Sequence, residues 1–186
     1  MSSRLRSRLW LVGVGSGRTD WLRWLEILGS PLLGPGVLSL YDISVGIKLL
    51  CDDALAFRPT SIVGINRGGS IVGGWVAKQV GLPYIHSAIV NFDLSPELRV
   101  DCTATSATLG TRILLVDDAK RKGEHMREAA AHLRRQNPNA QIRRCVLLEM
   151  VLPHQGPEKD AFREAALERS GFVTTRSDVT LPWDPS

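Results

Sequence analysis

The sequence predicts an open α/β fold, in which a mostly parallel, twisted sheet carries helices on its faces. Runs typical of buried strands occur at residues 61–65, 83–90, 112–118 and 141–151, and segments with helical spacing of apolar residues lie between them. Helical connections of ten or more residues between strands are typical of parallel crossover units. The chain has 186 residues, which suits one domain with a sizeable core.

The pattern also predicts where individual helices begin and end. A first helix is expected from Asp42, acting as the N-cap, to about Phe57, and Arg58-Pro59 ends it. Residues 91–111 are expected to be irregular or hairpin-like, and a last strand is expected from Phe172. Further helices are predicted at 21–28, 71–81, 123–135 and 160–171, and Gly81 and Gly171 end the helices at 71–81 and 160–171.

Composition and cysteine usage exclude several classes of protein. Hydrophobic residues make up 44% and charged residues 23% of the chain, as in soluble globular proteins. No apolar run reaches the ~18 to 20 residues of a membrane helix, and the N-terminal apolar run is too short for a signal peptide. We therefore expect a cytoplasmic protein with no membrane partner. The three cysteines form no CxxC pair, which argues against a zinc site or a disulfide framework.

Basic residues are concentrated in one part of the sequence. The net charge is +4, and residues 120–144 contain eight Lys or Arg residues against two acids. Such an excess favours an anionic partner, and nucleic acid is one candidate. A solvated helix surface is the alternative interpretation of the same residues.

A glycine-rich loop follows the strand at 61–65. Gly68 and Gly69 let the backbone approach a ligand, and Arg67 adds a planar, permanently charged donor. The helix that starts behind the loop adds partial positive charge. This combination predicts a site for an oxyanion such as phosphate or pyrophosphate. A tight turn with a surface arginine is the alternative.

Two adjacent acids, Asp117 and Asp118, end the strand at 112–118. Their carboxylates can accept hydrogen bonds from sugar hydroxyls or help to hold Mg²⁺, and Gly123 opens a helix whose N–H groups suit a phosphate. Helix capping by Asp118 is the alternative. Ligands bind beyond the carboxyl ends of the strands in such sheets, so we expect this loop and the glycine-rich loop to lie side by side.

These motifs together resemble the type I phosphoribosyltransferases. The strand, turn and helix of SIVGINRGGSIVGGWVAKQVGLPYI are similar to the pyrophosphate loop of that family, and RILLVDDAKRKGEHM is similar to its signature for phosphoribosyl pyrophosphate (PRPP). The tail LPWDPS is similar to the end of the small bacterial xanthine-guanine branch. The resemblance covers about residues 40–184. It implies a core domain at 39–186 and an N-terminal extension or hood segment at 1–38.

The resemblance also implies a chemistry, the exchange of pyrophosphate on Mg²⁺-bound PRPP for a nitrogenous base. It assigns the ribose hydroxyls and, directly or indirectly, Mg²⁺ to Asp117 and Asp118, and it makes residues 91–110 a mobile loop. It further implies a homodimer. The phosphate-binding residues that it implies are Arg67, Gly68, Gly69, Lys120, Arg121, Lys122, Gly123, Glu124 and His125.

The chain departs from the family pattern at several of these positions. Arg121 stands where a third acid often serves as the general base, and Lys122 and His125 stand where threonines are usual. In the base pocket, Asp178 stands at the place of a stacking aromatic and Glu149 near that of a lysine that reads a purine carbonyl, beside Trp183. General base catalysis accounts for a factor of ~10² to 10⁴ in rate, so the loop raises the question of whether catalysis is retained.

Three functions remain open on the sequence. The first is an active phosphoribosyltransferase acting on an unusual base. The second is a noncatalytic relative that binds a nucleotide as a sensor or assembly partner. The third is nucleic-acid binding through the basic residues of 120–144. Each predicts a different observation. The enzyme releases pyrophosphate, the noncatalytic relative binds its ligand without releasing pyrophosphate, and a nucleic-acid-binding protein has an affinity that falls steeply with salt.

Overall fold

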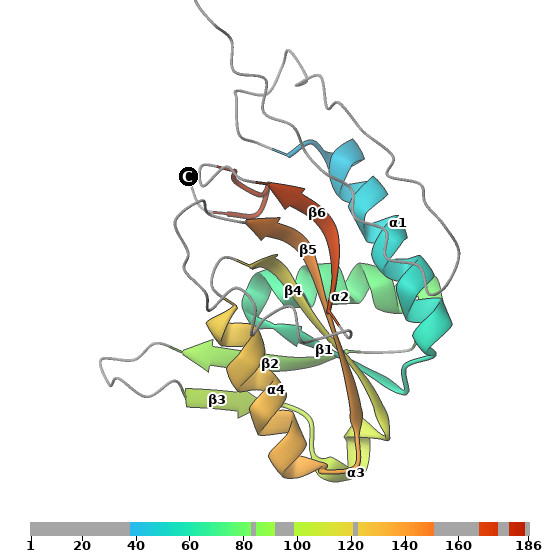
Figure 1. Ribbon diagram of the computed structural model, residues 1–186, viewed down its shortest axis with the longest axis vertical. Coiled ribbons are helices and arrows are strands. Elements are labelled where there is room, and N and C mark those ends of the chain that lie inside the picture. The colour runs from blue at the N-terminus through green and yellow to red at the C-terminus, as the bar shows by residue number, and fades with distance from the viewer. Residues whose placement is uncertain are drawn as a thin grey trace, which may run out of the picture.

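A computed structural model of the chain describes residues 38–82, 85–91, 99–120, 123–150, 168–174 and 179–184. Six strands form one sheet in the order β3-β2-β1-β4-β5-β6 (Figure 1). The strands are β1 (Ser61–Ile65), β2 (His86–Asn91), β3 (Arg99–Cys102), β4 (Arg112–Lys120), β5 (Gln141–Met150) and β6 (Glu168–Thr174). The helices are α1 (Leu40–Phe57), α2 (Asn66–Val80), α3 (Ser106–Leu109) and α4 (Glu124–Gln136).

The sheet confirms the predicted open, mostly parallel architecture. β1 pairs in parallel with both β2 and β4, and the parallel pairing continues through β5 to β6. Only β3, at one edge, runs antiparallel, against β2. This β2–β3 pairing agrees with the expected hairpin, although residues 92–98 between the strands lie outside the described residues.

Helices cover both faces of the sheet, with α1 and α2 on one face and α4 on the other (Figure 1). Under α1 and α2, Ile43 and Val72 pack with Leu114 of β4. Under α4, Leu133 packs with Leu115 of the same strand. Successive side chains of a strand point to opposite faces, so β4 supplies both cores. This double burial explains the unbroken apolar run of β4.

The N-cap of α1 lies three residues before the predicted one. Ser39 is the N-cap of α1, and Asp42 is the third helical residue, which completes a capping box. The Ser39 backbone N–H donates to Asp42 Oδ2 at 3.0 Å, while the Asp42 N–H donates to Ser39 Oγ at 3.2 Å. The prediction that Asp42 is the cap was therefore wrong by one turn, because serine and a carboxylate three residues on satisfy two backbone N–H groups together.

The predicted helix at 160–171 is wrong over its last four residues. Residues 168–171 belong to β6, and residues 160–167 lie outside the described residues. Gly171 lies under α1, and a Cβ atom there would come within 2.8 Å of the Leu147 carbonyl oxygen and 3.2 Å of Gly46. Pairing with β5 and this close contact outweigh the helical pattern of the local sequence.

Within the described residues, no helix combines the length and apolar character needed to cross a membrane. The expected N-terminal hood segment, residues 1–38, lies outside the described residues except for Leu38. The division into 1–38 and 39–186 stays a prediction.

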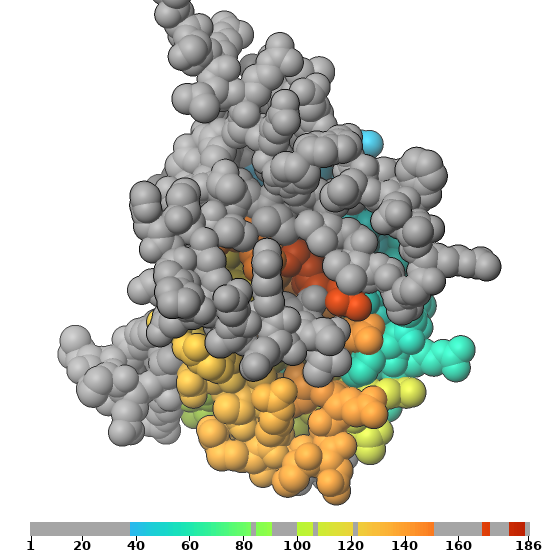
Figure 2. All heavy atoms as spheres, viewed as in Figure 1, coloured from blue at the N-terminus to red at the C-terminus, as the bar shows by residue number. Residues whose placement is uncertain are grey.

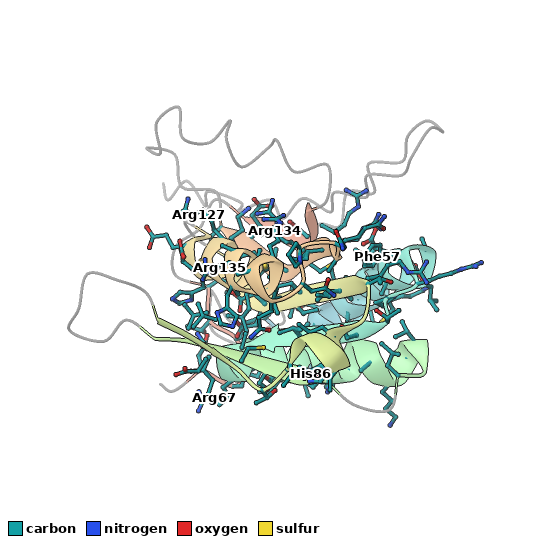
Figure 3. The ribbon with its side chains drawn as sticks, turned by 90° about the horizontal axis from the view of Figure 1, so that it is seen from below. Phe57, Arg67, His86, Arg127, Arg134 and Arg135 are labelled. Carbon is teal, nitrogen blue, oxygen red and sulfur yellow. The ribbon has the colours of Figure 1, made fainter. Side chains whose placement is uncertain are left out.

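A partly buried charge cluster joins α1 to β5 and β6. Asp53 Oδ1 accepts hydrogen bonds from Arg143 at 2.9 Å and from Arg169 at 3.1 Å. The Arg143 guanidinium also lies 4.7 Å from the centre of the Phe57 ring, which Figure 3 labels. Cys145 lies beside Asp53, and burial together with that carboxylate raises the pKa of the Cys145 thiol well above its ordinary value. The Asp53 carboxylate thus holds α1 against β5 and β6.

Replacing Asp53 by Asn should lower the free energy of unfolding by on the order of 1–3 kcal/mol, because two partly buried guanidinium groups lose their charged partner. Asp52→Asn is the matched control. Asp52 pairs with Lys48 on the exposed side of α1, where such a pair contributes only about 0.3–0.5 kcal/mol. Urea unfolding measures both changes, and equal losses in the two variants would contradict the role given to Asp53.

Candidate functional site

The two marked loops lie side by side, as the sequence predicts. β1 and β4 are neighbours, and their register places Gly64 opposite Val116. Residues 66–69 therefore follow β1 at the level where Asp117 and Asp118 continue β4. Because both strands end at the same edge, the glycines and the two acids face one another there.

The segment NRGGS, predicted as a turn, forms the first turn of α2. Asn66 begins this helix with φ 52°, a left-handed conformation that asparagine tolerates better than most residues. The Val90 N–H donates to Asn66 Oδ1 at 2.8 Å, and Ser70 Oγ donates to the Asn66 carbonyl oxygen at 2.6 Å. These bonds fix the start of α2 against β2. No side chain caps the helix, which leaves its first N–H groups for other partners.

Gly68 and Gly69 allow a very close contact between α2 and β4. A Cβ atom on Gly69 would lie 2.5 Å from the Val116 carbonyl oxygen. A Cβ atom on Gly68 would overlap the Asp118 carboxylate. The two glycines therefore let the helix start rest directly on the end of β4, with the Asp118 carboxylate against the Gly68 backbone.

Asp118 accepts hydrogen bonds on both carboxylate oxygens. The Ala119 N–H donates to Oδ1 at 2.8 Å, and the indole Nε1–H of Trp183 donates to Oδ2 at 2.7 Å. The Trp183 carbonyl oxygen accepts a hydrogen bond from Arg67 at 3.0 Å. One tryptophan from the C-terminal segment thus connects the loop after β1 to the end of β4.

Asp117 differs from its neighbour in burial. It alternates with Asp118 along β4 and shares the orientation of Ile113 and Leu115, toward the face that α4 covers. Burial, together with the nearby Asp118 carboxylate, raises the pKa of Asp117 well above its ordinary value. The Asp118 N–H donates to Asp117 Oδ1 at 2.9 Å and opposes this shift. Asp118 is therefore the more accessible of the two acids.

The start of α4 faces the same edge. Gly123 is the N-cap of α4 with φ 72°, and no side chain caps the helix. Glu124 and His125 follow in the first turn. Burial lowers the pKa of His125, while the negative charges of Glu124 and Asp118 oppose this change. The His125 side chain and the Asp118 carboxylate therefore interact electrostatically. Arg121 and Lys122 lie outside the described residues.

Lys120 lies within β4, two residues beyond the predicted end of that strand. Its ammonium group is buried and lies 3.1 Å from Glu149 Oε1 of β5. Ser170 of β6 donates to Glu149 Oε2 at 2.6 Å. The structure thus joins two predicted site residues, Lys120 and Glu149, across the neighbouring strands β4 and β5, and Ser170 extends the contact to β6. Asp178, the third predicted member of the base pocket besides Trp183, lies outside the described residues.

Sequence reasoning did not find three of these features. The hydrogen bond from Trp183 to Asp118, the one from Arg67 to the Trp183 carbonyl and the anchoring of Asn66 to β2 all join distant parts of the chain. Only Asn66 carried a local signal, since asparagine before glycines at a strand end suits a left-handed residue. The other two contacts depend on where the C-terminal segment packs.

The phosphoribosyl transferase domain model matches residues 47–169, more than half of the chain. This range contains both loops and the six-stranded sheet except for residues 170–174 of β6. The chain belongs to the type I phosphoribosyltransferase family. Comparison with curated protein sequences gives no significant match.

Solved structures with the same fold cover most of the chain. The purine phosphoribosyltransferase of Pyrococcus horikoshii matches with a TM-score of 0.61 and 17% identity over 81% of this chain and 94% of that one. The Helicobacter pylori xanthine-guanine-hypoxanthine phosphoribosyltransferase matches with a TM-score of 0.61 and 12% identity over 80% of this chain and 92% of that one. A Neisseria gonorrhoeae protein with bound ppGpp matches with a TM-score of 0.57 and 17% identity over 80% of this chain and 88% of that one. At these identities the likeness concerns the fold.

Gly69→Ala should destabilise the protein by on the order of 1–3 kcal/mol, because its methyl group would press on the Val116 backbone. Gly74→Ala, in the same helix, is the control. A Cβ atom there meets nothing within 4 Å, so alanine should stabilise the helix by up to about 1 kcal/mol. Thermal unfolding compares the two, and a Gly69→Ala variant as stable as the wild type would refute the close contact.

Asp117→Asn should raise the melting temperature at pH 7 to 8. The raised pKa of Asp117 means that the folded state binds its proton to a higher pH than the unfolded chain. Stability therefore falls as the pH rises above about 4, the ordinary carboxyl pKa, through the raised folded-state pKa. Asparagine avoids this loss, so the advantage of the variant should disappear near pH 3 to 4. An advantage that did not change with pH would argue against a raised pKa.

Proposed function

We propose that this protein binds the ribose 5-phosphate part of PRPP or of a nucleotide at the joined ends of β1 and β4. One observation carries the proposal, namely that the Asp118 carboxylate lies against the Gly68 backbone at the start of α2 and also acts to raise the pKa of His125 in the first turn of α4. An acceptor for sugar hydroxyls is thus near two helix N-termini, and helix N-termini favour phosphate groups.

Each part of the ligand has a matching group in this proposal. The Gly68 and Gly69 backbone and Arg67 take the pyrophosphate or the equivalent anion. The Asp118 carboxylate accepts hydrogen bonds from the ribose hydroxyls. The first turn of α4, beginning at Gly123, takes the 5′-phosphate. Helix α4 has no side-chain cap on its first turn, which leaves N–H groups for phosphate oxygens.

Mg²⁺ accompanies PRPP in this proposal and is held mainly by phosphate oxygens. The described residues contain no group of three or more His, Cys, Asp or Glu side chains that could bind a metal. Mg²⁺ commonly keeps several waters and uses one or two carboxylates with substrate phosphates. Asp118, the more accessible acid, fits that role, whereas the raised pKa of Asp117 disfavours its charged form.

Whether the bound ligand reacts separates the two leading possibilities. Transfer of phosphoribose to a base would release pyrophosphate. Because Arg121 stands at the position of the usual third acid, another residue would have to serve as the general base. A noncatalytic relative would bind the nucleotide without release. The bound ppGpp in the Neisseria gonorrhoeae structure supports nucleotide binding by this fold in general.

The basic excess of residues 120–144 supports nucleic-acid binding less well than the sequence suggests. Arg127, Arg134 and Arg135 are exposed on α4 (Figure 3), and α4 forms part of the molecular surface (Figure 2). Lys120, however, is paired with Glu149, and Arg143 with Asp53 on the opposite face of the sheet. Among the residues that the structure describes, the basic side chains of 120–144 therefore do not form one continuous surface.

Calorimetric titration with Mg²⁺ and PRPP, and with GMP and AMP, tests the proposal. Asp118→Asn should weaken binding by about tenfold or more, because a hydrogen bond to a charged group contributes roughly 1.5–3 kcal/mol. Asp101→Asn, at an exposed position of the edge strand β3, is the control and should bind as the wild type does.

A pyrophosphate-release assay with a panel of bases, run on the same protein, then separates catalysis from binding alone. Failure of PRPP, GMP and AMP to bind would contradict the proposed function. Equal weakening in Asp118→Asn and Asp101→Asn would contradict the location of the site.

A further inference from the structure

The C-terminal segment 179–184 is packed firmly into the fold and brings Trp183 to the candidate site. Val179 and Leu181 are buried in the core under α1 and α2. The Leu38 N–H donates to the Thr180 carbonyl oxygen at 3.3 Å, which ties the segment to the residues before α1. Asp184 Oδ2 accepts from the Leu181 N–H at 3.0 Å and closes a tight turn around Trp183. The position of Trp183 is therefore set by the fold.

Two polar groups of Trp183 engage residues that the proposed function assigns to the ligand. Its indole N–H donates to Asp118 Oδ2 at 2.7 Å, and its carbonyl oxygen accepts from Arg67 at 3.0 Å. The first bond uses the acceptor for ribose hydroxyls, and the second uses the cation for the anionic group. Trp183 thus offers each of them a substitute partner from the protein itself.

The Asp118 carboxylate is also held where a ligand anion would approach. It lies directly against the Gly68 backbone, in the space that a side chain on Gly68 would fill. A carboxylate at a helix N-terminus makes favourable interactions with the helix dipole, as a phosphate would. With Asp118 in this position, a phosphate oxygen cannot reach the same part of the Gly68 backbone.

We propose that Trp183 is a latch that holds Asp118 and Arg67 in a self-paired arrangement and that ligand binding must open it. The latch consists of Arg67, Asp118 and Trp183. It rests on the proposed function and adds a mechanism of regulation to that site. The ribose hydroxyls replace the indole N–H on Asp118, and the ligand anion replaces the Trp183 carbonyl on Arg67.

The latch lowers the affinity for ligand because part of the interaction with Asp118 must be exchanged before binding. The apparent dissociation constant equals the intrinsic one divided by the fraction of molecules in which the latch is open. The indole bond to a carboxylate is charge-assisted and therefore stronger than one between neutral groups. Removing only the indole N–H should free Asp118 while the aromatic ring keeps its packing.

Trp183→Phe tests the latch, with Trp75→Phe as the matched control. Trp75 is an exposed tryptophan of α2, and its indole makes no contact that the latch uses. Both variants and the wild type are titrated by calorimetry with GMP, and with PRPP and Mg²⁺. Trp183→Phe should bind at least about threefold more tightly than the wild type, and Trp75→Phe should bind equally. Thermal unfolding confirms that both variants are folded.

A second measurement uses the unmodified protein. In an ¹⁵N NMR spectrum of the indole groups, the Trp183 signal is the one that Trp183→Phe removes. It should shift progressively as GMP saturates the wild type, because its hydrogen bond to Asp118 is lost. The Trp75 signal, removed in the control variant, should stay in place.

The outcomes separate the latch from the proposed function. Tighter binding by Trp183→Phe with a moving Trp183 signal supports the latch. Equal or weaker binding by Trp183→Phe, when the wild type binds, overturns the latch and leaves the proposed function standing. A Trp183 signal that does not move at saturation also overturns it. No binding by either protein contradicts the proposed function, and the latch fails with it.

Discussion

The site depends on how closely the start of α2 approaches the backbones of β1 and β4. A side chain on Gly64 would lie 2.5 Å from Ser70 Cα, and one on Gly69 would lie 2.5 Å from the Val116 carbonyl oxygen. The helix therefore rests on both strands with no side chains between them at these points. This contact fixes the position of Arg67 and Gly68 relative to Asp118, and with them the distances that any ligand bridging the two loops must match.

Much of the fold could be predicted because its signals are local. The apolar runs of β1, β4 and β5, the glycine after β1 and the glycine before α4 each indicate an element without reference to the rest of the chain. One error arose where distant contacts decide, since residues 168–171 form a strand because they pair with β5. The other error is local, since the capping of α1 depends on a reciprocal pair of hydrogen bonds between Ser39 and Asp42 rather than on one acid.

The sequence predicts where the candidate site lies, but it does not predict which hydrogen bonds and ion pairs its residues form with one another. Arg67, Gly68, Asp117 and Asp118 come together because parallel neighbouring strands end at one edge, which sequence order implies. Their partners could not be inferred in this way. The ion pair of Lys120 with Glu149 requires the register of β4 against β5, in which these residues lie opposite each other. The role of Trp183 requires the path of the C-terminal segment.

The shared carboxylate of Asp53 has a consequence for how the sheet is assembled. Arg143 and Arg169 point to the same face of neighbouring strands, since Arg169 lies opposite Cys145 and residues two apart share a face. A shift of β6 by one residue would turn Arg169 to the face covered by α4, away from Asp53. The cluster therefore stabilises one alignment of β6, a strand whose flanking sequence favours a helix, over the neighbouring alignments.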